Sequence, residues 1–216
     1  MIRHHPPLEL LMEYATGAAQ QGAALVVATH IARCGSCAAE VGRLEAAGGV
    51  LLHAAGTGPV GDHLLPALLE RLDEPALVPE PEPHFDAETL RLFPAPLRRH
   101  LGCNLAELDW RRTTGFFEEV VVGLSSQGEK ALLLKLQPGC PVPPHSHIGH
   151  ELILVLDGGY SDEYGRYNRG DFGTLCPGEV HNPIVDDDNG CFCLVVVDGP
   201  VKLLDGTDII SDPSWI

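Results

Sequence analysis

Apolar residues follow two different periods along the chain, and the change between them predicts two structural halves. Near the start and the end of residues 1–73 they recur every three or four positions, as on one face of a helix. These positions are Leu8, Leu11, Met12, Tyr14, Leu64, Leu65, Leu68, Leu69 and Leu72. After residue 85, short runs of Val, Leu and Phe between Gly and Pro turns predict antiparallel strands. The runs are 116–124, 131–136, 151–156 and 191–197.

The two halves are separated by a segment that favours neither helix nor strand. Residues 74–84 contain four prolines and three glutamates, which block helix formation and keep the chain solvated. We therefore expect an α + β protein of two domains: a small helical domain at 1–73, a linker at 74–85, and an antiparallel β-barrel at 86–216. Residues 86–112 have helical and then strand-like character and form the lead-in of the barrel.

Charge and composition limit the partners and the compartment. Thirty acidic against fourteen basic residues give a net charge of −16, which excludes direct nucleic-acid binding and attracts basic protein partners, although acidity also serves solubility alone. The chain has neither an apolar run long enough to cross a membrane nor an export signal. Seven cysteines, an odd number with metal-ligand spacings, favour the reducing cytoplasm.

A first group of metal-binding residue types lies in the helical half. His30, Cys34 and Cys37 follow one another at i, i+4 and i+7, so one helical face and its continuing turn bring them together. Imidazole and thiolate suit Zn²⁺, whose closed structural sites take four ligands. His5 is the expected fourth ligand and His4 its competitor. The alternatives are small core cysteines or a redox pair, but no βαβ pattern surrounds the motif.

A second group lies in the β half. His145 and His147 point to the same side of an extended strand, Glu151 returns to that side, and His150 falls out of phase. A glycine-rich turn through Gly170 and Gly178 directs His181 toward them. Three histidines and one glutamate bind Zn²⁺ or another divalent transition metal, since ligand type alone does not decide between Zn, Fe, Mn, Ni and Cu.

The spacing of this second group resembles the two cupin motifs. Gly139-x5-His145-x-His147-x3-Glu151-x6-Gly158 matches the first motif throughout. The second motif, from Gly170 to His181, departs at Cys176, which takes a proline position, and it lacks the later asparagine of the family. These departures put the local turn in doubt more than the metal site. The resemblance implies a jelly-roll barrel for the second domain.

Together, the two groups resemble the ChrR type of zinc anti-sigma factor along nearly the whole chain. The resemblance implies that the helical domain sequesters an extracytoplasmic-function sigma factor, and that the cupin domain senses singlet oxygen or an organic peroxide. By this resemblance, the protein is expected to be a regulator and not an enzyme. The alternatives are a cupin metalloenzyme of the dioxygenase kind with an accessory zinc domain, and a zinc-stabilised scaffold for another regulator.

Three further expectations concern residues outside the metal groups. Residues 64–72 either lie in a groove of the sigma factor or pack on the other helices. Cys191 and Cys193 share one face of a strand and either relay a redox signal or are buried as small apolar side chains, because a disulfide across Cys-x-Cys is strained. Cupin barrels often pair through sheet edges, which predicts a homodimer.

Overall fold

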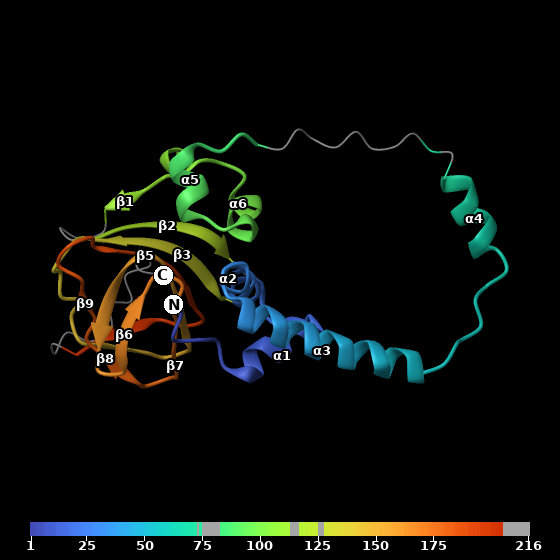
Figure 1. Ribbon diagram of the computed structural model, residues 1–216, viewed down its shortest axis with the longest axis horizontal. Helices are drawn as coiled ribbons and strands as arrows, with labels where there is room; N and C mark the ends of the chain where they lie inside the picture. Colours follow the sequence, from blue (N-terminus) through green and yellow to red (C-terminus); the bar gives the residue numbers. More distant parts are fainter. Residues whose placement is uncertain (73, 75–82, 113–116, 125–127, 205–216) are drawn as a thin grey trace.

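The predicted α + β class is confirmed by the computed structural model of the chain (Figure 1). The described residues are 1–72, 74, 83–112, 117–124 and 128–204. The predicted linker lies largely outside them. No helix in these ranges is long and apolar enough to cross a membrane.

All helices of the described residues precede the first strand. Helices α1 to α3 pack together beside the barrel, whereas α4 stands apart from it (Figure 1). Helices α5 and α6 and the 3₁₀ turn η1 lead into the first strands. The bounds are α1 Leu8–Thr16, α2 Gln21–Ile31, α3 Gly35–Ala54, α4 Leu64–Arg71, α5 Ala87–Leu92, α6 Ala95–Leu101 and η1 Leu105–Glu107.

The strands of the described residues form two antiparallel sheets that enclose the barrel interior. The larger sheet has the order β1-β2-β3-β10-β5-β6, with β7 and β9 also paired to β5, and the smaller sheet has the order β11-β4-β8. The bounds are β1 Arg111–Arg112, β2 Phe117–Leu124, β3 Lys130–Leu136, β4 His145–His147, β5 Glu151–Asp162, β6 Gly165–Asn168, β7 Phe172–Leu175, β8 Val180–His181, β9 Ile184–Val185, β10 Cys191–Val197 and β11 Val201–Leu203.

The central strands are buried on both faces. In β10 every residue is buried, and alternate side chains belong to two different cores. Phe192 and Leu194 face the helices, while Cys193 and Val195 face the barrel interior, as the two-residue period of a strand requires. A strand covered on both sides reads as a continuous apolar run rather than as an alternating one, which explains the sequence of residues 191–197.

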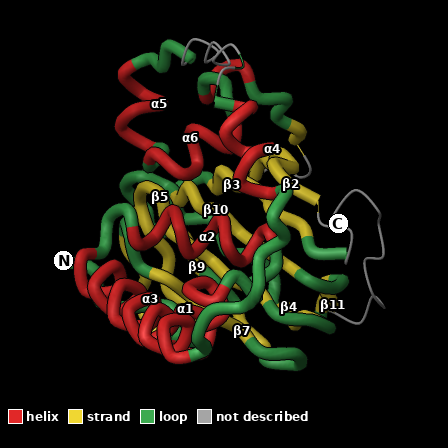
Figure 2. The backbone as a smooth tube through the Cα atoms, turned by 90° about the vertical axis from the view of Figure 1, so that its right-hand side faces the viewer, coloured by secondary structure: helices red, strands yellow, loops and turns green. Residues whose placement is uncertain are grey.

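The N-terminal helices lie against the outer face of the large sheet (Figure 2). Val26 and Val27 of α2 are fully buried in one apolar core together with Leu154 of β5 and Leu194 of β10. The helical half and the barrel therefore share a core, which the sequence analysis did not anticipate.

Polar contacts fix α2 to the barrel at both of its ends. At its start, the backbone N–H groups of Gly22 and Ala23 donate to the carboxylate of Glu129, at 2.6 and 3.1 Å. A carboxylate at this position also complements the positive end of the helix dipole. Just after its end, the guanidinium of Arg33 donates to the carbonyls of Leu156 and Leu92, at 3.3 and 2.9 Å.

We expect Glu129→Ala to loosen this attachment. The substitution leaves two buried N–H groups without their acceptor, which costs about 1–3 kcal/mol and lowers the melting temperature by several degrees. Differential scanning calorimetry measures the shift, with Glu70→Ala on exposed α4 as the matched control. Equal melting temperatures for the two variants would show that the carboxylate does not stabilise the junction.

Candidate metal centres

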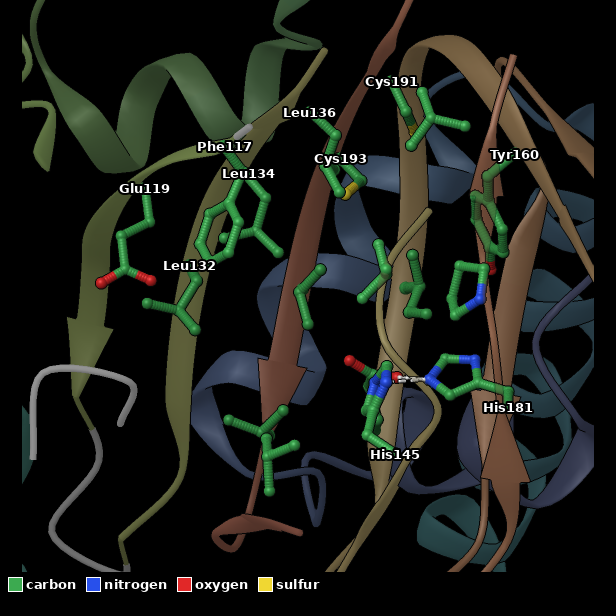
Figure 3. A pocket seen from close by; sticks show the side chains of 18 of the residues that line it. Phe117, Glu119, Leu132, Leu134, Leu136, His145, Tyr160, His181, Cys191 and Cys193 are labelled. Atoms are coloured by element: carbon green, nitrogen blue, oxygen red, sulfur yellow. Dashed lines mark hydrogen bonds and ion pairs between the residues drawn. The ribbon is translucent and has the colours of Figure 1, made fainter. Parts of the chain in front are cut away.

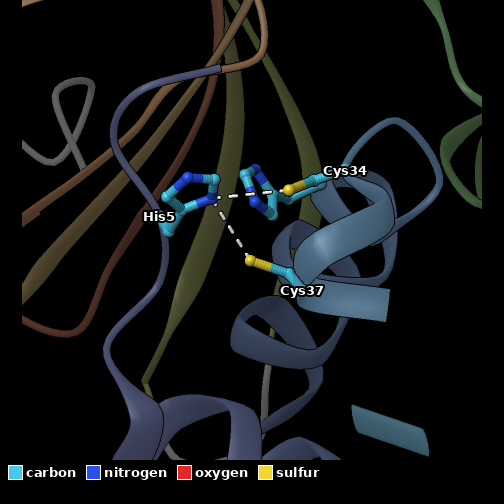
Figure 4. A group of neighbouring side chains, drawn as sticks. His5, Cys34 and Cys37 are labelled. Carbon is cyan, nitrogen blue, oxygen red and sulfur yellow. Dashed lines mark hydrogen bonds between the residues drawn. The ribbon is translucent and has the colours of Figure 1, made fainter. Parts of the chain in front are cut away.

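The first group of ligands gathers where the N-terminal segment meets two helix ends (Figure 4). His5 precedes α1, His30 lies in the last turn of α2, Cys34 caps the start of α3 and Cys37 lies in its first turn. The sequence predicts one helical face and its continuing turn; the turn is present after Ile31, but a new helix then starts at Gly35, so Cys37 does not lie on the helix of His30. This break turns the two cysteines toward His5.

One potential ligand atom from each of these four residues lies within 4.8 Å of the others. The Nδ1 atom of His5 is 3.4 Å from the sulfur of Cys34 and 3.3 Å from that of Cys37. Burial and the neighbouring Cys34 thiol raise the pKa of Cys37 to about 11. Two close thiolates repel each other without a cation, so this arrangement suits a bound metal ion.

His30 is oriented by the barrel rather than by its own helix. Its Nδ1 lies 3.1 Å from the carbonyl oxygen of Gly170, so Nδ1 carries the proton and Nε2 is left as the free ligand atom. Nε2 is buried without a hydrogen-bond partner. Burial, followed by the nearby His5, lowers the pKa of His30 to about 4, which keeps the imidazole in its neutral, metal-binding form.

His5 and not His4 faces the cluster. The ring of His4 packs against Tyr167, with ring centroids 4.5 Å apart. The backbone around His4 is hydrogen-bonded to the barrel. The N–H groups of Arg3 and His4 donate to the carboxylate of Asp171, and the carbonyl of His4 accepts from the N–H of Phe172. The barrel therefore sets which of the two adjacent histidines points toward the cysteines.

The second group of ligands lies inside the barrel. His145 and His147 come from β4, Glu151 from the start of β5 and His181 from β8, and their ligand atoms also lie within 4.8 Å of one another. All four are buried. His150 is exposed and contacts Asp198 instead, as its phase on the strand predicts.

Hydrogen bonds leave the Nε2 atoms of two of these histidines facing each other. Nδ1 of His145 lies 2.8 Å from the carbonyl of Pro143, and Nδ1 of His181 lies 3.3 Å from the carboxylate of Asp162. With both protons on Nδ1, the two Nε2 atoms are both acceptors, yet they are only 2.8 Å apart. A cation bound by both lone pairs resolves this repulsion.

The remaining two ligands support the same conclusion. Both ring nitrogens of His147 and the Oε2 atom of Glu151 are buried without a hydrogen-bond partner, although His147 Nε2 lies 3.2 Å from Glu151 Oε2. Leaving such atoms unsatisfied is costly in a protein interior. The donor set and its unpaired atoms thus fit a divalent transition metal.

The turn that the sequence analysis placed in doubt is formed. The N–H of Glu179 donates to the carbonyl of Cys176 at 3.1 Å, and Gly178 takes a φ of 82°, where a side chain is strained. The N–H of Gly178 also donates to the carbonyl of His147. Cys176 at the proline position therefore still delivers His181 into the barrel.

An apolar cavity of about 300 Å³ adjoins the second group (Figure 3). The histidines line one part of it, and Phe117, Leu132 and Leu134 line another. Cys191 and Cys193 also line it, and both are buried free thiols. Burial as small side chains, one of the two expectations, is confirmed for them, and a role in redox relay stays a prediction.

Three functional neighbours were missed by sequence reasoning. Asp162 orients His181, Asp171 holds the N-terminal segment, and the hydroxyl of Tyr160 enters the cavity without a hydrogen-bond partner. Only Asp171 has a local signal, since it directly follows the motif residue Gly170. The other two act across strands, where spacing along the chain is uninformative.

The fold and the two ligand groups define a class of protein, one with a helical His/Cys cluster docked on a cupin barrel. The model of the family described as "ChrR Cupin-like domain" matches residues 98–202. The anti-sigma-E factor ChrR of Cereibacter sphaeroides is 34% identical over 93% of this chain and 92% of its own length. The chain therefore belongs to the ChrR family of anti-sigma factors.

One solved structure agrees with this membership. ChrR in the crystal structure of Rhodobacter sphaeroides SigE in complex with the anti-sigma ChrR has a TM-score of 0.79 and 32% identity, covering 92% of this chain and all of that one. An RmlC-like cupin protein from Ralstonia eutropha has a TM-score of 0.44 and 19% identity, over 50% of this chain and 74% of its own. The second likeness is too weak to bear on activity.

Proposed function

We propose that this chain is an anti-sigma factor that sequesters an extracytoplasmic-function sigma factor through α1–α4. The observation that carries the proposal is α4, whose leucines are exposed and of which no residue is buried. Packing of this segment on the other helices, one of the two expectations, is wrong for the described residues. An amphipathic helix that packs on no other described part of its chain is suited to a groove on another protein.

A second apolar surface points to the same partner. The exposed residues Val50, Leu51 and Leu52 lie in the last turns of α3, which extends beyond the barrel (Figure 1). Membership of the ChrR family, and the complex of a relative with SigE, support a sigma factor as the occupant. The net charge of −16 favours association with the basic DNA-binding regions of such a factor in the cytoplasm.

Both ligand groups are proposed to hold metal. His5, His30, Cys34 and Cys37 would hold Zn²⁺, which stabilises the small helical domain. His145, His147, Glu151 and His181 would hold Zn²⁺ or another divalent transition metal. The cupin domain is then a sensor, not an enzyme, that releases the sigma factor after singlet oxygen or an organic peroxide has reacted. Pairing of two barrels through sheet edges stays a prediction.

Charged substitutions in α4 test the binding surface. Leu65→Glu with Leu69→Glu should weaken sigma binding by about 100-fold, because burying unpaired carboxylates in an apolar groove is costly. Leu90→Glu on α5 is the matched control, since Leu90 is 51% exposed and Leu69 is 53% exposed. Binding is measured by titration calorimetry with a sigma factor from the same genome, and inhibition by in vitro transcription. Unchanged binding by the α4 variant would exclude this helix from the interface.

A further inference from the structure

The interior of the barrel is larger and less polar than a metal site alone requires. The cavity beside His145, His147, Glu151 and His181 has a volume of about 300 Å³, which reaches the range of small-molecule sites. Apart from the four ligands, its walls are almost entirely aliphatic and aromatic. The apolar walls include Leu132, Leu134, Leu136, Ile153, Val185, Val195 and Val197.

The charge of the proposed metal site determines which polar group a bound small molecule would carry. Counting only the direct ligands, three neutral histidines and one carboxylate leave a divalent ion with one unit of net positive charge, while the carboxylate of Asp162 lies behind His181 at its outer nitrogen, Nδ1. In an apolar cavity such a charge is stabilised by one bound anion. Glu119, the other acidic residue of the wall, lies on β2 and interacts electrostatically with Lys130 at the strand start. The cavity thus matches one negative charge near the histidines.

Tyr160 supplies a second polar group in the wall of the same cavity. Its side chain is 4% exposed, it lines the cavity, and its hydroxyl has no hydrogen-bond partner. Burial, with the nearby carboxylate of Glu151, raises the pKa of Tyr160, so the hydroxyl stays protonated and able to donate. Tyr167 stacks on it with centroids 4.8 Å apart but is not part of the wall.

We propose that the barrel binds an amphiphilic monocarboxylate, with its carboxylate at the metal and the Tyr160 hydroxyl, and its apolar tail between the two sheets. The Tyr160 hydroxyl and the positive charge of the metal with its direct ligands match the carboxylate of such a molecule, and the apolar walls match its tail. The site is independent of the sigma-binding surface on α4, and it rests on the metal occupancy proposed for the cupin ligands.

Binding of straight-chain carboxylates to the full, metal-loaded chain tests the proposal by calorimetry. From acetate to octanoate the affinity should rise by about fourfold per added methylene, as burial of apolar groups predicts. Octanol, which has the tail without the charge, should bind at least about tenfold more weakly than octanoate. A flat chain-length series, or octanol binding as tightly as octanoate, overturns the proposal.

Two tyrosine variants locate the head group. Tyr160→Phe keeps the shape of the cavity but removes the donor, so octanoate affinity should fall about tenfold. Tyr167→Phe is the matched control and should leave the affinity within about twofold. An equal loss in both variants, or none in Tyr160→Phe, excludes Tyr160 as the donor and overturns its part of the proposal.

Metal analysis separates the failure of this site from failures elsewhere. Elemental analysis of the wild type should give two metal ions per chain, and His147→Ala should give one and lose octanoate binding. A wild-type chain with a single metal ion that His147→Ala retains overturns both the cupin metal and the carboxylate site. If the chain holds both ions but its affinity for carboxylates does not depend on their chain length, the carboxylate site alone is overturned. Sigma binding is measured separately, and neither result bears on it.

Discussion

Replacing Cys34 by alanine should remove the zinc of the helical domain and abolish inhibition of the sigma factor. Helices α1 and α3 together bury only Leu10, Leu11, Cys37 and Val41 among their described residues, so their own packing is sparse. A closed structural zinc site contributes roughly 10–16 kcal/mol in small zinc-finger peptides, so its loss outweighs such a thin core. We expect sigma binding to weaken by about 100-fold or more, equivalent to at least about 2.7 kcal/mol.

Cys103→Ala is the matched control, because Cys103 is a half-buried free thiol outside both ligand groups. Zinc content is measured by elemental analysis, and inhibition by transcription in vitro with purified polymerase and sigma factor. If Cys34→Ala retained both zinc and inhibition, the cysteines would be core side chains, as the alternative interpretation of the sequence holds. If zinc were lost and inhibition kept, the sigma-binding surface would not depend on the metal.

The ligand groups were predictable because the chemistry of their residues is local in sequence. The spacing from His145 to Glu151 follows from the two-residue period of a strand, and the structure brings these residues together with His181. The helix break before Cys34 was not predicted, since His30, Cys34 and Cys37 also satisfy the period of one continuous helix. The choice between His4 and His5 depends on Asp171 and Tyr167, more than 150 residues away in sequence.

The junction between the two halves was not predictable for a different reason. The proline-rich segment suggested separate domains, but the shared core depends on which apolar faces meet in three dimensions. The continuous apolar run of residues 191–197 did carry a signal that both faces of that strand are covered. It gave no information on which element covers them. Consequently, the contacts of His30 with Gly170 and of α2 with Glu129 are visible only in the structure.

These contacts join the two ligand groups through one part of the barrel. His181 is held by Asp162 at the end of β5, and β6 follows directly after a turn. Beyond β6, Gly170 accepts from His30 and Asp171 accepts from the N-terminal segment that carries His5. A change at His181 that shifted β6 would therefore reach two ligands of the helical site. This connection gives the proposed sensor a physical route to the sigma-binding domain.

Replacing His147 by alanine should separate sensing from binding. His147 belongs to the proposed cupin ligand group and lies on β4 of the smaller sheet, whereas α2 packs on strands of the larger sheet. The barrel has its own apolar core, so loss of this metal should leave the fold and the docked helices in place. We expect sigma affinity to stay within about twofold of the wild type, since a distant substitution adds little to binding. Release by singlet oxygen or an organic hydroperoxide should be lost.

The measurement is the rate at which the sigma complex dissociates during exposure to the oxidant, with His150→Ala as the matched control. His150 lies on the same segment but is exposed and contacts Asp198 rather than the ligand group, so its loss should leave release intact. Loss of sigma binding in His147→Ala would mean that the cupin metal supports the helical domain through the shared core. A full oxidant response in the same variant would instead place the sensor at the thiolates of Cys34 and Cys37, where oxidation removes zinc directly.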